Sequence, residues 1–425
     1  MRATTGASRT RATSLLIAAL ATVTALGVGT ATAASNTTAV AAAKKPAPFA
    51  AALDASVPKV MQANAIPGSV VYVISPKGTY RKTFGTAVLG DTVPLQMQDY
   101  FRIGSNTKTM TVTVIMQLVQ EGKLKLTDPI SKFVPNTPDG DNITIAQLAE
   151  MRSGLFSYTF DPAFNVTIDN EPQKAWTPDE LLTIAFAHPN NFAPGTQFEY
   201  SNTNLVLLGV VIEKLTGMSA RDAFAQRIDK PLKLQHTQLP KAEDSTIPDP
   251  HPQGYQFGTN VQTLDSYAVP ADQLPAALDG TYKPLDQTDA NPSWAWTAGG
   301  AISTVDDLAV YVKAMVGGGL LDKKSQKIRM DSIQVINPKT PSVGYGLGMA
   351  KFGTFYGHDG QLPGFSSMMV YDPKAKTTVV LFTTLSATPE TGENAAVAVF
   401  RQAVIPALGG TAAGSPTGAT TTTAG

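Results

Sequence analysis

Two groups of strand-forming residues lie near opposite ends of this chain, and they constrain its fold more than any other feature. Residues 69–75 read Ser-Val-Val-Tyr-Val-Ile-Ser and end at a Pro-Lys-Gly turn. Residues 367–371 and 377–383 flank the polar stretch 372–376, which is the pattern of a hairpin. The sequence between the two groups is rich in helical periodicity. We therefore predict an α+β fold in which both ends of the chain build one sheet and the middle is a mostly helical insertion.

The N-terminus carries the pattern of a secretory signal peptide over residues 1–33. Three arginines within the first eleven residues precede an uncharged run over 14–29, and an Ala-Thr-Ala site ends at Ala33. A membrane anchor is the alternative, but the apolar run is short and is diluted by threonine and glycine. We expect bacterial export, a secreted mature protein, and no membrane anchor after cleavage.

Composition divides the remaining chain into three parts. Residues 34–48 form a flexible leader, 49–408 form the folded domain, and 409–425 have too few apolar groups to offset the entropy of ordering, so this tail is expected to be disordered. The chain has no cysteine, which excludes disulfides and a thiol nucleophile. Basic and acidic residues number 33 each, so no net charge draws the protein to nucleic acid.

A first polar cluster contains Ser105 and Lys108, in an S-x-x-K pattern at the start of a predicted helix over 107–121. The lysine lies one turn along the helix from the serine, and a serine hydroxyl needs such a neighbouring base to act as a nucleophile. A lysine amine can serve if a dry site lowers its pKa. The helix start also supplies N–H groups for a developing oxyanion. The same spacing also occurs at Ser56 and Lys59. The alternative interpretation of Ser105 is that it is an ordinary helix cap.

The second cluster contains Tyr200 and Asn202, which flank one residue just before a predicted helix over 205–215. In an extended turn their side chains can point the same way. A tyrosine hydroxyl can relay a proton, and an amide can hold a substrate carbonyl or orient the lysine. The alternative is a turn in which Asn202 caps the following helix.

The third cluster, residues 357–361, reads Gly-His-Asp-Gly-Gln and precedes the C-terminal strands. His358 is one of four histidines and the only one in an H-x-G pattern. Gly360 would let a substrate backbone approach a strand edge closely. A glycine-rich strand entry with a solvated imidazole is the alternative. The three clusters together, rather than any one of them, indicate an active site.

Taken in order, S-x-x-K, Y-x-N and a K-T-G-like triplet resemble the signature of penicillin-recognising serine enzymes. The similarity is to D-alanyl-D-alanine carboxypeptidases and class C β-lactamase-like hydrolases, and it covers about residues 50–405. Framework stretches such as Ser153-Gly154-Leu155 and 298–308 are part of it. The resemblance implies a β-lactamase/transpeptidase-like fold. In that fold the N- and C-terminal segments form a five-stranded antiparallel sheet flanked by helices, with an inserted mostly helical domain.

The resemblance also implies catalytic roles. Ser105 would be the acylated nucleophile, and Lys108 and Tyr200 would share the proton transfers, in an order that is disputed for such enzymes. Backbone N–H groups of Ser105 and Gln361 would form the oxyanion hole. No metal and no cofactor are implied, and His188, His236 and His251 lack the spacing of metal ligands.

Substrate binding would fall on a second group of residues: Asn202, Lys351, His358, Asp359, Gly360 and Gln361. Asn202 would hold the substrate amide, and His358 stands where many relatives have lysine. Asp359 replaces the threonine or serine that commonly occupies the middle of the third motif, so its charge opposes a substrate carboxylate. The carboxylate-binding arginine of one subgroup falls near Lys351, which would act as a point charge.

The leading functional hypothesis is an exported, monomeric hydrolase that acts on D-alanyl-D-alanine or other D-amino-acid peptides and amides, including peptidoglycan stem peptides. An esterase is the alternative within the same mechanism, because an ester does not need the carboxylate clamp weakened at Asp359. A β-lactamase needs fast deacylation, which these motifs do not reveal. A catalytically inactive cell-wall binding protein should have lost one of Ser105, Lys108 or Tyr200, and all three are present.

Overall fold

The computed structural model describes residues 46–410 of the 425-residue chain. The expected signal peptide over 1–33 lies outside the described residues, as do most of the expected leader and tail. Folded structure begins slightly before the predicted boundary, because Ala47 is buried and lies against Gly78.

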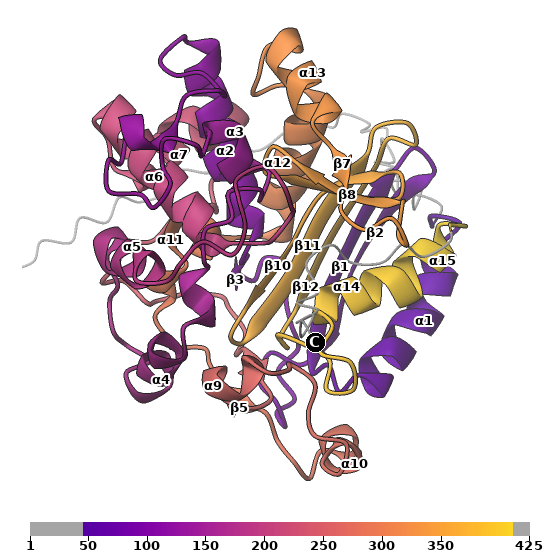
Figure 1. Cartoon of the computed structure of the whole chain (residues 1–425). Helices are drawn as coiled ribbons and strands as arrows, with labels where there is room; N and C mark the ends of the chain where they lie inside the picture. The colour runs from indigo at the N-terminus through magenta and orange to yellow at the C-terminus, as the bar shows by residue number, and fades with distance from the viewer. Residues whose placement is uncertain (1–45, 411–425) are drawn as a thin grey trace, which may run out of the picture. The chain divides into compact units, whose positions relative to one another are not determined.

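One antiparallel sheet runs through the described part of the chain in the order β2-β1-β12-β11-β10-β9-β8-β7 (Figure 1). Its strands are β1 (Gly68–Ser75), β2 (Gly78–Gly85), β7 (Gln334–Val335), β8 (Val343–Gly346), β9 (Met349–Phe352), β10 (Phe355–Leu362), β11 (Phe365–Asp372) and β12 (Thr377–Thr383). Strand β1 pairs with both β2 and β12, with Val70 opposite Phe382. The predicted sheet made from both ends of the chain is therefore confirmed.

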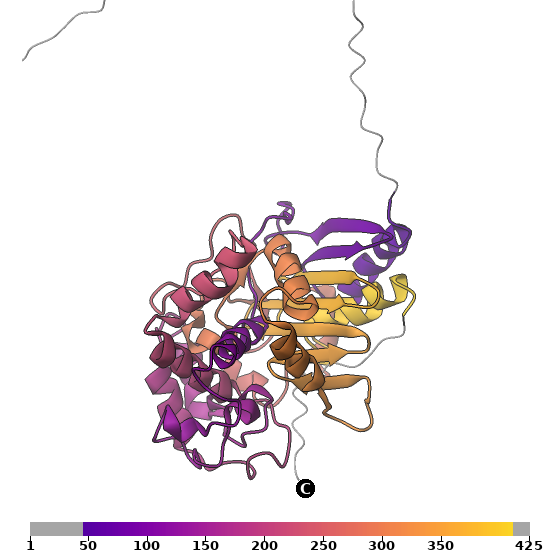
Figure 2. The same cartoon turned by 90° about the horizontal axis from the view of Figure 1, so that it is seen from above.

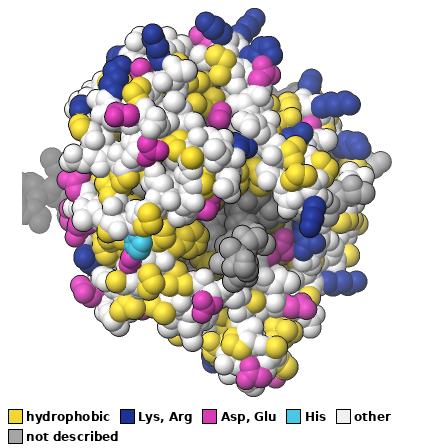
Figure 3. Space-filling model, viewed as in Figure 1, with side chains coloured by type: hydrophobic (Ala, Val, Ile, Leu, Met, Phe, Trp, Pro, Cys, Tyr) yellow, Lys and Arg dark blue, Asp and Glu magenta, His cyan; other side chains and the backbone are white. Residues whose placement is uncertain are grey.

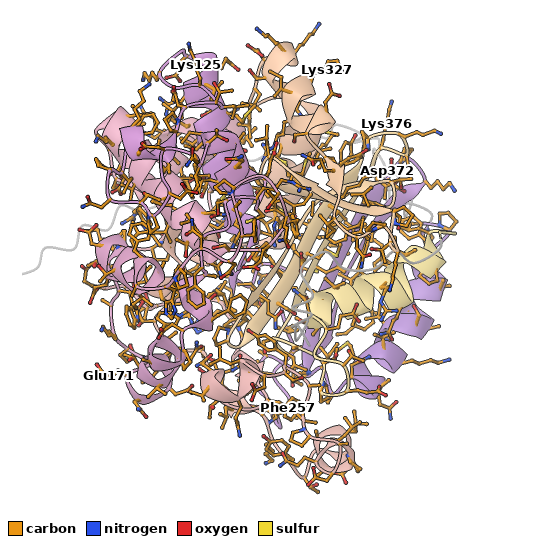
Figure 4. The ribbon with its side chains drawn as sticks, in the orientation of Figure 1. Lys125, Glu171, Phe257, Lys327, Asp372 and Lys376 are labelled. Carbon is orange, nitrogen blue, oxygen red and sulfur yellow. The ribbon has the colours of Figure 1, made fainter. Side chains whose placement is uncertain are left out.

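The predicted C-terminal hairpin is formed by β11 and β12. Its turn carries Asp372 and Lys376, both labelled in Figure 4. The Asp372 carboxylate accepts hydrogen bonds from the backbone N–H groups of Lys374 and Ala375, each at 2.8 Å. This side chain replaces a backbone partner within the turn, which is why aspartate favours such positions.

The sheet has eight strands rather than the five that the resemblance implies. Strands β2, β1, β12, β11 and β10 have seven or eight residues each, and the shorter β9, β8 and β7 continue the sheet beyond β10. The region from 343 to 352 contains three glycines, which lower strand propensity and conceal these strands in the sequence. At Gly344 a Cβ atom would stand 2.8 Å from the Gln334 carbonyl oxygen, so glycine permits the close pairing of β8 with β7.

Most of the chain between β2 and β7 is helical or irregular. Two short sheets lie in it, β3 (Phe101–Arg102) with β6 (Ile302–Ser303), and β4 (Tyr255–Gln256) with β5 (Leu285–Asp286). The helices and helical turns of the described residues are α1 (Ala50–Ala63), α2 (Asn106–Gln120), η1 (Ile130–Lys132), α3 (Ile145–Ala149), η2 (Tyr158–Phe160), α4 (Pro162–Asn170), α5 (Pro178–Phe186), α6 (Asn202–Thr216), α7 (Ala220–Phe224), η3 (Ala225–Asp229), α8 (Lys230–Leu232), α9 (Asn260–Thr263), α10 (Leu274–Asp279), η4 (Pro292–Trp294), α11 (Trp296–Gly299), α12 (Val305–Gly317), α13 (Lys323–Asp331), α14 (Ala395–Val399), η5 (Phe400–Val404) and α15 (Ile405–Ala407).

Helices cover both faces of the sheet (Figures 1 and 2). Helices α12 and α14 both pack on β11 and β12, and α1 lies beside the C-terminal helical segment. Helix α2 contacts β10 and is buried along most of its length, so it occupies the centre between the sheet and the helical region. No single helix within residues 46–410 is long and apolar enough to cross a membrane. Helix α6 has the required length and apolarity only in combination with the helical segment that follows it, which is bent relative to α6.

Candidate active site

Ser105 lies at the point where α2 begins, opposite β10. Gly104 has a left-handed backbone (φ +53°), and a Cβ atom on it would stand 2.6 Å from the backbone nitrogen of Gln361. Only glycine fits both the backbone conformation and this close approach. The Asn106 amide donates to the Ile103 carbonyl at 3.1 Å and to Ser367 Oγ at 2.7 Å, which ties the helix start to β11. The segment with the S-x-x-K serine therefore lies against β10, the strand that carries the third motif.

Lys108 is fully buried, and its Nζ meets three oxygen atoms. These are the Asn202 Oδ1 and the Ala298 carbonyl, each at 2.6 Å, and the Ser105 Oγ at 3.1 Å. Burial lowers the pKa of Lys108 well below its usual value, against a smaller opposing effect of Asp359. A neutral amine has two N–H donors, which the amide and carbonyl oxygens can accept. Its lone pair is then left to accept the Ser105 proton.

Tyr200 lies beside this amine and lines the cavity at Ser105. The Lys108 Nζ stands 4.8 Å from the centroid of its ring. Burial raises the pKa of Tyr200 well above its usual value, with the Ser105 hydroxyl opposing the shift. The phenol therefore stays protonated, which suits a proton donor better than a first proton acceptor.

Asn202 begins α6 but does not cap it with its side chain, because Ser201 is the N-cap residue. Its Oδ1 accepts from Lys108, and its Nδ2 donates to Thr159 Oγ1 at 3.2 Å. Thr159 in turn shares a hydrogen bond of 2.9 Å with Ser157 Oγ. Sequence reasoning missed Thr159 and Ser157, since nothing in the local pattern joins them to a residue more than 40 positions away.

We expect Thr159→Val to slow covalent labelling of Ser105 by a fluorophosphonate about fivefold to tenfold. Valine has nearly the same shape but leaves the Asn202 amide without an acceptor, at a cost of about 1 kcal/mol for one hydrogen bond. Thr159→Ser keeps the hydroxyl and should label at nearly the wild-type rate. Equal rates for the valine and serine variants would show that Thr159 does not orient the amide.

His358 occupies a different position from the one expected. It is fully buried and does not line the cavity. Its Nε2 lies 3.1 Å from the Tyr345 hydroxyl, and its Nδ1 lies 2.5 Å from the Asp359 carbonyl oxygen. Burial lowers the pKa of His358 to about 3, with Lys108 adding to the shift, so the ring is neutral at physiological pH. The structure therefore does not place the His358 ring at the cavity wall, and its contact with a substrate stays a prediction. The His358 ring packs against the rings of both Tyr345 and Tyr200, with centroids 5.6 and 6.2 Å away.

The rest of the third motif divides between the cavity and the interior. Asp359 and Gln361 line the cavity, although Asp359 is only 2% exposed. Gly360 is buried, and a Cβ atom on it would stand 2.0 Å from the Ile103 carbonyl oxygen. This glycine thus makes room for the protein's own backbone before Ser105. The approach of a substrate backbone to Gly360 stays a prediction.

Two residues that the sequence singled out, Lys351 and Ser56, lie away from the cavity. Lys351 is in β9 opposite Tyr356, at a part of the sheet that the cavity does not reach, so its predicted role in substrate binding is not supported. Ser56 lies within α1, which packs beside the C-terminal helix, and it does not line the cavity. The second S-x-x-K pattern therefore does not share the cavity that Tyr200 and Asn202 line.

The cavity at Ser105 has a volume of about 570 Å³, within the range of small-molecule sites. Besides the motifs, four segments contribute to its walls: 159–165, 263–267, 294–299 and 391–394. Phe160 and Trp294 give it an aromatic side. Asn394, at the start of α14, also lines it and was missed by sequence reasoning. Within residues 46–410 no group of three or more histidine and acidic side chains is arranged to hold a metal ion.

Comparison with known proteins gives relatives over most of the chain. The family model described as "Beta-lactamase" matches residues 53–403. A D-stereospecific amidohydrolase from Streptomyces sp. is 32% identical, with a TM-score of 0.69, and the match covers 79% of this chain and 94% of that one. D-amino acid amidase from Ochrobactrum anthropi SV3, solved with D-phenylalanine, is 27% identical, with a TM-score of 0.68 and coverage of 84% and 99%.

A β-lactamase of Escherichia coli (strain K12) is 27% identical over 239 residues, which is 54% of this chain and 60% of that protein. The chain spans 60% to 64% of the length of the first curated relatives that it matches.

Proposed function

This chain belongs to the Beta-lactamase family, and from that premise we propose that it is a serine amidase that forms an acyl-enzyme on Ser105 and acts on D-amino-acid amides and peptides. The similarity to a D-stereospecific amidohydrolase and to a D-amino acid amidase supports an amide substrate of D configuration. The grouping of Ser105 and Tyr200 at one cavity, with the Lys108 Nζ 3.1 Å from the Ser105 Oγ and 4.8 Å from the Tyr200 ring, supports acylation of the serine. Export remains a proposal that rests on residues 1–33, and the monomeric state remains a prediction.

In the first half of the reaction, the Ser105 Oγ attacks the amide carbonyl carbon while its proton passes to the neutral Lys108 Nζ. The carbonyl oxygen becomes an oxyanion, for which the N–H groups of Ser105 and Gln361 are the candidate donors. The C–N bond then breaks, and the leaving nitrogen takes a proton from the Tyr200 hydroxyl, which the Lys108 ammonium replaces. Water cleaves the resulting ester with the proton transfers reversed, which restores Ser105 and releases the acid.

One observation favours an amidase over a carboxypeptidase: Asp359 lines the cavity. A carboxypeptidase must bind the free carboxylate of its substrate, and a carboxylate side chain opposes that charge. At an effective dielectric constant of about 20, two unit charges about 5 Å apart interact by about 3 kcal/mol, which is on the order of a hundredfold in affinity. An amide without a terminal carboxylate does not meet this repulsion.

One basic side chain lines the cavity wall together with Asp359. This basic residue is Arg401. Its guanidinium donates to both carboxylate oxygens of Glu393, at 3.1 and 2.8 Å. On the face shown in Figure 3, lysine and arginine side chains gather mainly along the top and right. They are sparse over α4 and α9, which lie at the lower left in Figure 1. The surroundings thus do not favour a substrate carboxylate.

We expect Asp359→Asn and Asp359→Thr to raise kcat/KM for a D-alanyl-D-alanine peptide with a free carboxylate by about tenfold to a hundredfold. The same variants should change kcat/KM for a D-amino-acid amide only a little, since the amide carries no opposing charge. Much of the gain should lie in KM, because the repulsion acts in the ground state as well as in the transition state. The measurement is steady-state kinetics on both substrates.

Asp265→Asn is the matched control, because it removes a carboxylate that also lines the cavity but is exposed to water. Solvent screens that charge, so this variant should leave the ratio of the two substrates nearly unchanged. Equal responses of peptide and amide to the Asp359 variants would mean that Asp359 does not select against carboxylates, and the carboxypeptidase hypothesis would regain its support.

A further inference from the structure

Asn394 joins two parts of the molecule through one buried side chain. It is 5% exposed and stands at the start of α14. Its Oδ1 accepts hydrogen bonds from the backbone N–H groups of Ala396 and Val397, at 3.0 and 3.1 Å, so it is the N-cap of that helix. This capping fixes the orientation of the amide, because only the oxygen can accept from N–H groups. The nitrogen must therefore point away from the helix.

The Asn394 nitrogen points to the third motif. It donates to the Gly360 carbonyl oxygen at 2.8 Å and lies 3.3 Å from Asp359 Oδ2. The helix start and strand β10 are more than 30 residues apart in the chain, and this amide connects them directly. The Gly360 carbonyl consequently has a hydrogen bond from outside its strand.

The Gly360 carbonyl and the Gln361 N–H belong to the same peptide unit. A trans peptide is planar, and its C=O and N–H bonds point in opposite directions, so holding one end sets the direction of the other. The Gln361 nitrogen lies at the side of β10 that faces Gly104 and the start of α2. Beyond Gly357, β10 pairs with β11 alone among the described strands, so no second neighbouring strand fixes this peptide unit.

We propose that Asn394 is a positioning residue that holds the Gly360–Gln361 peptide unit so that the Gln361 N–H faces the reacting carbonyl oxygen at Ser105. The inference rests on the proposed acyl-enzyme mechanism, in which this N–H is one donor of the oxyanion hole. Such donors are effective only when they are oriented before charge develops, since reorientation during the reaction consumes the stabilisation they give. Asn394 supplies that orientation from the helix that covers the sheet.

Two variants separate this role from helix capping. Asn394→Ser retains a good N-cap residue, but its side chain is too short to reach Gly360. Asn394→Asp also retains a cap and places a carboxylate oxygen against the Gly360 carbonyl and Asp359. We expect both variants to slow labelling of Ser105 by a fluorophosphonate about tenfold to a hundredfold, since loss of a whole oxyanion donor costs about a hundredfold to a thousandfold. For a hydrolysed amide the loss should appear in kcat, with KM nearly unchanged.

Thr177→Ala is the matched control, because it removes the N-cap of α5 at an exposed position that does not line the cavity. It should lower the melting temperature and leave the labelling rate unchanged. If Asn394→Ser labels at the wild-type rate, or if the rates of the Asn394 variants follow only their melting temperatures, Asn394 is a helix cap and the proposal is wrong. Labelling rates need no natural substrate, so a wild-type protein that is labelled but cleaves no D-amide would contradict the proposed substrate and leave this test intact.

Discussion

Ser105→Ala is expected to abolish covalent labelling by a fluorophosphonate and to reduce amide hydrolysis by several orders of magnitude. Loss of the nucleophile has this effect in serine hydrolases because the remaining groups only bind and polarise the substrate. The structure gives Ser105 three advantages: a helix start, the Lys108 amine at 3.1 Å, and a place on the cavity wall. The measurement is intact-protein mass spectrometry after incubation with the probe.

Ser56→Ala is the matched control, because it removes the serine of the other S-x-x-K pattern from α1. This variant should be labelled and should turn over substrate like the wild type. Labelling that survives in Ser105→Ala and disappears in Ser56→Ala would contradict the assignment of the nucleophile.

The second large effect is expected from the proton-transfer pair. Lys108→Ala and Tyr200→Phe should each slow acylation by about a hundredfold to ten-thousandfold, the range that general acid–base groups contribute. Because the two side chains act on the same proton path, the double variant should be scarcely slower than the slower single one. Stopped-flow measurement of acylation tests this. Losses that multiply in the double variant would mean that the two residues act independently.

The pH dependence follows from the pKa shifts. Acylation needs the neutral Lys108 amine, so its rate should fall as the pH decreases through the pKa of Lys108, which burial lowers well below the usual value. His358 does not cause this acid limb above about pH 4, since burial lowers the pKa of His358 to about 3. His358→Asn should therefore keep the midpoint of the limb nearly in place. Loss of the limb in that variant would transfer the titration to His358.

The parts of the fold that sequence predicts well are those set by local pattern. The hairpin of β11 and β12 follows from two β-branched runs around a polar turn, and α6 ends at Gly217, whose left-handed backbone is the usual helix terminator. Strands β7, β8 and β9 are not predicted from the sequence. Strand β7 has only two residues, and Gly344, Gly346 and Gly348 lower the strand propensity of the region that holds β8 and β9.

The parts of the site that sequence could not give depend on tertiary contacts. The motifs identify Ser105, Lys108 and Tyr200 by residue type and spacing. The structure brings Ser105 and Tyr200 to one cavity, with the buried Lys108 amine 3.1 Å from the Ser105 Oγ. The orientation of His358 depends on the packing of its ring against the rings of Tyr345 and Tyr200, which the sequence does not show. Sequence reasoning missed Asn394, because its hydrogen bond to Gly360 exists only where α14 packs on the sheet.

The central claim is that Ser105 is acylated by a D-amino-acid amide, and comparison of four substrates tests it most directly. These are D-phenylalanine amide, its L enantiomer, a D-alanyl-D-alanine peptide and a short-chain nitrophenyl ester, each measured as kcat/KM with the wild type and Ser105→Ala. The D-amide is expected to be cleaved faster than its enantiomer and faster than the peptide, and all cleavage should disappear in Ser105→Ala. A wild-type protein that cleaves the ester or the free-carboxylate peptide but spares the D-amide would contradict the claim.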